Sequence, residues 1–100
     1  SEGIGALLGD ARHWLEIGDD QDAVCVRVHH RLVQVHPFAN GNGRHARLYA
    51  DLLVVGLGAQ PFTWGALQNV DAPTIRAAYI SALHAADDGD LASLIAFART

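Results

Sequence analysis

Residues 36–44 read His-Pro-Phe-Ala-Asn-Gly-Asn-Gly-Arg, and Arg47 follows one helical turn later. Two glycines and an asparagine in front of a helix-forming run predict a tight turn that opens an α-helix near Asn42 or Gly43. The first N–H groups of such a helix point outward, and the helix dipole favours an anion there. His36 precedes the turn and carries a side chain that titrates near neutral pH. The stretch therefore predicts a phosphate site beside a candidate general base.

The helix that follows, from residue 42 or 43 to about Leu57, is apolar on nearly all sides. Its polar residues Arg44, Arg47 and Asp51 fall at i, i+3 and i+7 and form a single stripe. A helix of this kind belongs in the middle of a bundle, with only that stripe facing a cleft. The two arginines can reach one side of the helix and bind phosphate oxygens there, and Asn42 adds a neutral hydrogen-bond donor.

The rest of the chain is also helical by its pattern. Apolar residues recur at helical spacing over about 4–17, 21–35, 72–86 and 91–97, with a connecting loop over 60–70. Aspartates that can cap the later helices precede each of them: Asp19 or Asp20, Asp71 and Asp90. We therefore expect an all-α fold, a small helical bundle in a single domain that spans residues 1–100.

The composition excludes several classes of protein. Half of the 100 residues are hydrophobic and 18% are charged, which argues against disorder. The net charge of −4 leaves no basic surface for nucleic acid or for an anionic membrane. The chain contains seven arginines and no lysine. This excludes phosphate-binding loops and Schiff-base chemistry that require a lysine. The single cysteine, Cys25, suits a reducing cytoplasm, and the apolar run 52–59 is too short to cross a bilayer.

The motif resembles the signature of the Fic (filamentation-induced-by-cAMP) family, His-x-Phe-x-[Asp/Glu]-Gly-Asn-Gly-Arg-x-x-Arg. The matching positions are His36, Phe38, Gly41, Asn42, Gly43, Arg44 and Arg47, with Asn40 at the acidic position. The wider sequence, through residues 62–65 and 79–83 to the C-terminus, is similar to the subgroup called mobile mystery protein B. The resemblance implies a Fic-like helical bundle whose central buried helix follows the motif loop.

The resemblance also implies an activity, the transfer of AMP from ATP to a Ser, Thr or Tyr hydroxyl of a target protein. In that scheme His36 is the catalytic base, and Asn42 forms the anion hole together with the backbone of Gly41 and Gly43. Arg44 and Arg47 hold the β- and γ-phosphates, and Arg44 is a catalytic residue in this scheme as well. Mg²⁺ bridges the phosphates and is steadied at the position that Asn40 occupies. ATP and Mg²⁺ are therefore the expected cofactors.

Three departures from the family pattern bear on activity. Asn40 replaces an acidic residue and would bind Mg²⁺ more weakly than a carboxylate. The β-hairpin flap that aligns the target peptide in active relatives is not recognisable in the first 20 residues, so the chain looks like the C-terminal half of a fuller domain. The inhibitory [Ser/Thr]-x-x-x-Glu-[Gly/Asn] pattern does not occur around Glu2 or Glu16, so any inhibitor must be a separate protein or a missing segment.

These features leave two functions open. The first is an adenylyltransferase acting in the cytoplasm on a bacterial protein, as the toxin of a toxin–antitoxin pair or as a mobile-element protein. The second is a catalytically weak or inactive module that binds a nucleotide or a partner. Transfer of another phosphate-bearing group, or phosphorylation, is disfavoured because the phosphorylating relatives carry a lysine where this chain has Gly43.

Each site residue also has a purely structural interpretation. His36 could place a cation at a helix C-terminus, Asn42 could be an N-cap and Asn40 a turn residue. Arg47 and Asp51 could form an i, i+4 ion pair. Three histidines, His29, His30 and His36, lie in or near the motif. Their spacing gives no i, i+4 pair, and no carboxylate or cysteine completes a zinc site with them. We expect one of His29 and His30 to be packed and the other solvated.

Overall fold

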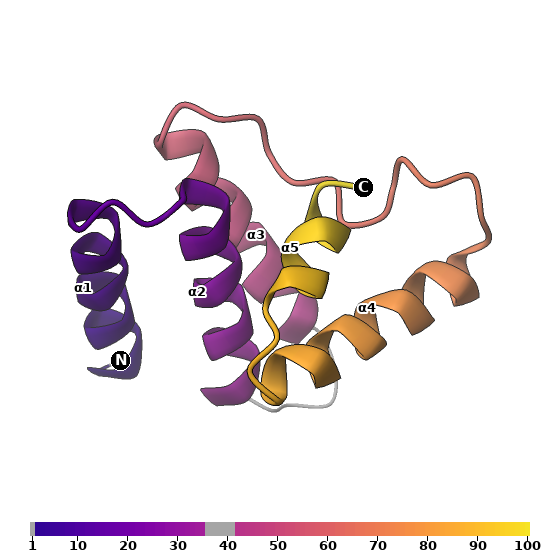
Figure 1. Ribbon diagram of the computed structural model, residues 1–100, viewed down its shortest axis with the longest axis horizontal. Coiled ribbons are helices and arrows are strands. Elements are labelled where there is room, and N and C mark those ends of the chain that lie inside the picture. The colour runs from indigo at the N-terminus through magenta and orange to yellow at the C-terminus, as the bar shows by residue number, and fades with distance from the viewer. Residues whose placement is uncertain (1, 36–41) are drawn as a thin grey trace. The chain divides into compact units, whose positions relative to one another are not determined.

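A computed structural model describes residues 2–35 and 42–100, with side chains for 5–34 and 44–100. This part of the chain forms five α-helices and no strand (Figure 1). The helices are α1 (Glu2–Glu16), α2 (Gln21–Val35), α3 (Asn42–Gly56), α4 (Ala72–Asp87) and α5 (Ala92–Ala98). The expected all-α fold is confirmed, and the boundaries lie close to those predicted from the apolar spacing.

The predicted capping residues explain where the helices begin. The Asp20 carboxylate accepts a hydrogen bond from the Ala23 N–H at 3.0 Å, and Asp71 accepts one from the Thr74 N–H at 3.1 Å. Asp90 accepts from the Ala92 N–H at 3.1 Å. Each aspartate satisfies a backbone donor that the first turn of a helix leaves without an acceptor.

The chain divides into two compact units, residues 1–61 and 62–100. The first contains α1, α2 and α3, and the second contains α4 and α5. Each unit has its own internal contacts. That the two form a single domain remains a prediction from the sequence.

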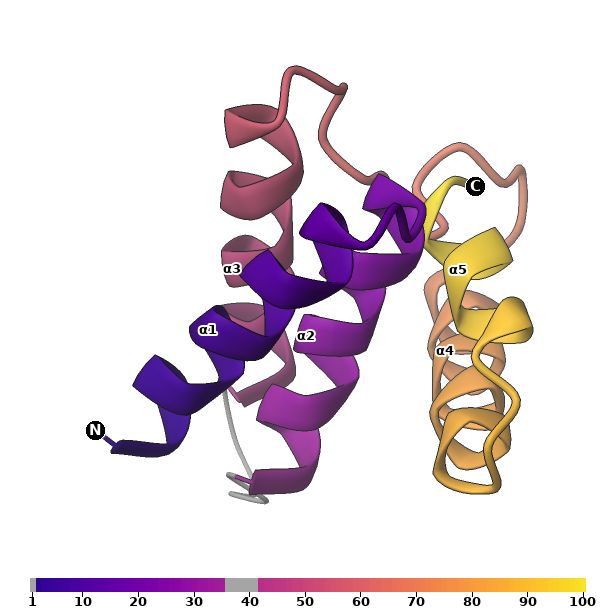
Figure 2. The same ribbon diagram turned by 60° about the vertical axis from the view of Figure 1, so that its left-hand side comes forward.

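In the first unit α2 packs against both α1 and α3 (Figures 1 and 2). Apolar side chains from the three helices meet in one cluster, whose buried members are Leu7, Ala11, Val24, Val28, Leu32 and Ala46. The α2 members are spaced four residues apart, as the sequence pattern predicted for a buried stripe. The cluster therefore fixes α2 between its two neighbours.

Helix α3 is buried on one side only. Ala46, Ala50 and Val54 are buried at i, i+4 and i+8. The apolar side chains of Leu48, Leu52 and Val55 are at least half exposed, at 54%, 64% and 50%. This apolar face is exposed within the first unit, and the place of α3 at the centre of the bundle remains a prediction from the sequence.

In the second unit α4 and α5 lie side by side (Figure 1). The rings of Tyr79 and Phe97 meet across this pair, with their centroids 5.7 Å apart. The loop before α4 is bound to the end of α5, because the Thr63 and Trp64 N–H groups donate to the Ala98 carbonyl at 2.8 and 3.0 Å. This loop crosses the pair at Gly65, which is buried.

Candidate active site

The structure locates the second half of the motif. Helix α3 begins at Asn42, as the glycine turn predicted, so Asn42 and Gly43 are its first two residues. The backbone N–H groups of residues 42–45 have no acceptor within an α-helix and stand at the positive end of its dipole. His36, Asn40 and Gly41 lie outside the described residues, as does the rest of the 36–41 segment.

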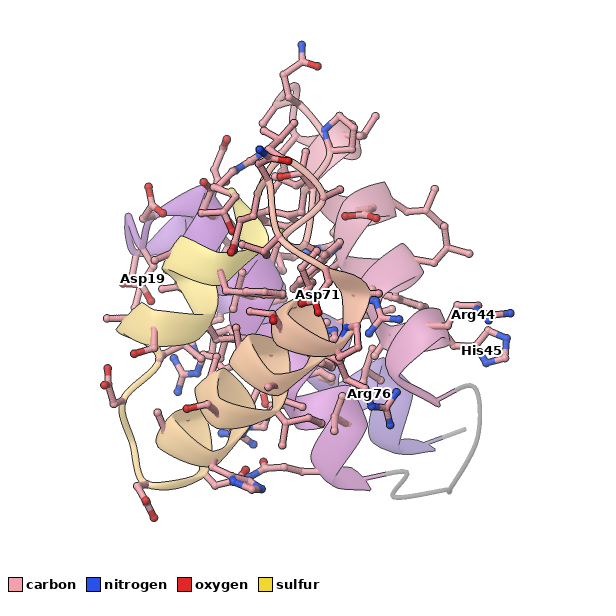
Figure 3. The ribbon with its side chains drawn as sticks, turned by 90° about the vertical axis from the view of Figure 1, so that its right-hand side faces the viewer. Asp19, Arg44, His45, Asp71 and Arg76 are labelled. Atoms are coloured by element: carbon pink, nitrogen blue, oxygen red, sulfur yellow. The ribbon has the colours of Figure 1, made fainter. Side chains whose placement is uncertain are left out.

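The first turn of α3 contains a cationic side chain, that of Arg44. It contains no acidic residue, and the side chains of Arg44 and His45 are exposed and point away from the helix (Figure 3). Helices α2 and α4, by contrast, begin with a capping aspartate, Asp20 or Asp71. The guanidinium of Arg44 is repelled by the positive end of the helix dipole, so this turn favours the binding of an anion.

Arg47 lies one turn further along α3 and is half-buried. Residues three apart on a helix lie on neighbouring parts of its surface, so Arg44 and Arg47 belong to one side of α3. Asp51, one turn beyond, is also half-buried. The expected polar stripe of α3 is therefore exposed at Arg44 and half-buried at Arg47 and Asp51.

Arg47 has a neighbour that the sequence did not assign to the site. His29 of α2 has no exposed surface, and its imidazole N–H donates a hydrogen bond to the backbone carbonyl of Ala46. Burial lowers the pKa of His29 from 6.5 to about 4, because desolvation outweighs the hydrogen bond and the charges of Arg47 and His30 lower it further. The His29 side chain is therefore neutral at physiological pH.

The expectation for the two adjacent histidines was wrong. His30 is buried as well, with 8% of its surface exposed, so neither side chain is solvated. The reason is that α2 is packed by α1 and α3, which together cover more of its circumference than one apolar stripe indicates. A signal was present in the sequence, since His29 lies only seven residues before His36.

The described residues contain no group of three or more His, Cys, Asp or Glu side chains arranged to hold a metal ion. Asn40, the candidate Mg²⁺ ligand, is not among them. No helix in the described ranges has both the length and the apolar character that crossing a bilayer requires.

The sequence profile of the Fic/DOC family matches residues 10–54, which include α2, the motif and nearly all of α3. This segment is therefore similar to the Fic/DOC family. Over 69% of its length the chain is 39% identical to protein adenylyltransferase fic-1 of Caenorhabditis elegans, and it covers 12% of that protein. It is 29% identical over 94% of its length to protein adenylyltransferase Fic of Drosophila mojavensis, of which it covers 18%.

The Fic fold extends beyond the matched segment. A solved structure of Fic-1 from C. elegans superimposes with a TM-score of 0.67 and 31% identity, covering 98% of this chain and 28% of that chain. The chain thus spans less than a fifth of the curated relatives' length in these comparisons. The observed helices are therefore those of a Fic fold, and the activity of the longer relatives is carried to this chain as a proposal.

Proposed function

We propose that the Fic segment transfers AMP from ATP to a Ser, Thr or Tyr hydroxyl of a target protein. The observation that carries the proposal is the start of α3 at Asn42, inside the glycine turn of the motif, with Arg44 in the same turn. A helix N-terminus and an arginine at this position support a polyphosphate site. The relatives named protein adenylyltransferase are similar over this same region.

In the proposed reaction His36 takes the proton of the target hydroxyl, whose oxygen attacks the α-phosphorus as pyrophosphate leaves. Asn42 and the N–H groups of Gly41 and Gly43 stabilise the charge that develops on the phosphate oxygens. The guanidinium groups of Arg44 and Arg47 bind the β- and γ-phosphates, which holds the leaving group in place.

The amide oxygen of Asn40 is the ligand that this chain would supply to Mg²⁺, an ion that prefers oxygen ligands. The ion would neutralise phosphate charge, and the neutral amide would hold it more weakly than the family's carboxylate does. The arginines then carry a larger share of the phosphate charge.

The sequence resemblance to mobile mystery protein B, which remains a prediction, leads to a narrower proposal: the protein is a bacterial toxin restrained by a separate antitoxin. The animal relatives in the comparisons do not bear on this point. Expression of the chain in a bacterium should slow growth, and the variant His36→Ala should not. Equal growth of the two strains would contradict the toxin proposal.

Transfer itself is tested with ATP labelled on the α-phosphate. The wild type should label a protein in a cell extract, or itself, and His36→Ala should lose nearly all label because no base accepts the hydroxyl proton. His13→Ala is the matched control, since His13 is an exposed histidine on α1. Equal labelling by the wild type and His36→Ala would remove the assigned role of His36.

A second candidate function is nucleotide binding without transfer, which the neutral Asn40 favours. Calorimetry with ATP separates the two functions, because a binding module releases heat on mixing but produces no labelled protein. If the wild type is such a module, Asn40→Asp should strengthen Mg²⁺-dependent ATP binding and bring transfer back. An absence of ATP binding, with and without Mg²⁺, would remove both candidate functions.

A further inference from the structure

We propose that His29 is a positioning residue, whose hydrogen bond to the Ala46 carbonyl holds α3 against α2 so that Arg47 can bind the β- and γ-phosphates. The inference rests on the proposed function and names a residue outside the family motif. It concerns binding of the pyrophosphate half of ATP and not the chemistry at the α-phosphorus.

The contact that carries the inference lies in an apolar interface. His29 has no exposed surface and Ala46 has 4%. Val28 and Leu32 of α2 belong to the same apolar cluster as Ala46 of α3. A buried N–H without an acceptor is costly, so the hydrogen bond favours one register of α3 along α2 over its neighbours. Apolar packing alone would tolerate small shifts more easily.

The acceptor is adjacent to the arginine that needs placing. Ala46 precedes Arg47 in α3, and the charge of Arg47 lies close enough to His29 to lower its pKa. A charged imidazole in this place would repel the guanidinium, whereas the neutral ring can donate to the carbonyl and leave Arg47 its positive charge for phosphate. The neutral imidazole of His29 therefore holds the backbone of α3 in place without repelling the guanidinium of Arg47.

The chain connectivity extends the effect to the whole motif. Helix α2 ends at Val35 and α3 begins at Asn42, so the motif residues between them join the two helices that this hydrogen bond ties together. Fixing one helix against the other fixes both ends of the segment that contains His36. Precise placement of this kind is what phosphate clamps contribute to catalysis.

The test compares the affinities of ATP and AMP, because only ATP carries the β- and γ-phosphates. In His29→Leu, which keeps volume and removes the N–H, the Kd for ATP should rise about tenfold, the loss typical of one charge-assisted hydrogen bond. The Kd for AMP should change by less than about twofold. In an Arg47→Ala background His29→Leu should cause no further loss of ATP affinity, since both changes remove the same contact.

Two further sets of variants separate positioning from general packing. His29→Gln and His29→Asn each keep an N–H near one of the two ring nitrogens, and at least one should recover the wild-type ratio of ATP to AMP affinity. Val24→Ala removes methyl groups from the buried face of α2, one turn or more from His29. It should lower the melting temperature and leave the ATP to AMP ratio unchanged.

A measurement on the wild type does not depend on any variant folding. The imidazole N–H proton of His29 should exchange slowly in NMR spectra, and its chemical shift should move on addition of ATP but not of AMP. The inference is overturned if the chemical shift of this proton changes equally with ATP and with AMP. It is also overturned if His29→Leu weakens the binding of both nucleotides equally, or if it lowers the ATP affinity further in the Arg47→Ala background. Failure of the proposed function looks different, because the wild type itself would then bind no ATP.

Discussion

A neutral imidazole with no exposed surface makes the stability of this chain depend on pH. The pKa of His29 is about 4 in the folded state, against 6.5 when it is solvated. Between these values the unfolded chain binds a proton that the folded chain does not, so the free energy of unfolding falls as pH falls from 6.5 toward 4. The full loss is about 3 kcal/mol, since each pKa unit corresponds to about 1.4 kcal/mol.

Urea denaturation followed across this pH range checks the prediction. The wild type should lose stability steadily below pH 6.5, and His29→Leu should show a much flatter dependence. Identical slopes in the two proteins would mean that other groups cause the acid sensitivity.

Gly65 is a second residue whose identity the structure requires. Its φ of +84° disfavours any side chain, and a Cβ there would lie 2.8 Å from Ile75 Cγ2 and 2.9 Å from Phe97 Cε1. Gly65→Ala should therefore destabilise the protein by about 2–4 kcal/mol, through backbone strain and overpacking together. Gly89 has a similar φ of +95° with open space around it, so Gly89→Ala should cost only about 1 kcal/mol. Thermal unfolding of both variants separates backbone strain, which both share, from overpacking, which only Gly65→Ala should cause. Equal losses of unfolding free energy would contradict the proposed clash with Ile75 and Phe97.

At the scale of the helix, α3 has two unlike apolar faces. Val54 is fully buried and Leu52 is 64% exposed, although the two are close in sequence. Val54→Ala should cost about 2 kcal/mol of unfolding free energy, because buried methyl groups are lost and a cavity remains. Leu52→Ala should stay within about 0.5 kcal/mol of the wild type. Chemical denaturation measures both, and a large loss for Leu52→Ala would show that this face is covered in solution.

The helices themselves could be predicted because their signals are local. The apolar spacing of α2 and the aspartates at positions 20, 71 and 90 act within a few residues, and each was found where expected. Which side of α3 is covered could not be predicted, since Leu48 and Val54 are equally apolar and only the position of α2 decides between them.

The same distinction holds for the candidate site. Asn42, Gly43, Arg44 and Arg47 lie within six residues of one helix, so their nearness follows from the local sequence. His29 comes to Arg47 from another helix, and a single sequence does not show which residues of α2 face α3. The burial of both His29 and His30 is a tertiary effect of the same kind.

At the scale of the molecule, the Fic segment lies in the first compact unit, from α1 to α3. The second unit has its own ordered contacts, in which Gln68 Nε2 donates to Thr100 Oγ1 at 2.9 Å and Arg99 stacks 4.3 Å above Phe62. These contacts lie outside the family match, while the Fic-1 structure aligns with 98% of the chain. The fold is thus shared over both units, and the proposed chemistry lies in the first.

The most direct test of the account uses two samples of ATP, one labelled on the α-phosphate and the other on the γ-phosphate. AMP transfer by the motif predicts that protein becomes labelled from the α-labelled ATP alone, and that the γ-label is released with pyrophosphate. Labelling of protein from γ-labelled ATP, or from neither sample when ATP is bound, would contradict the assignment of AMP transfer to this site.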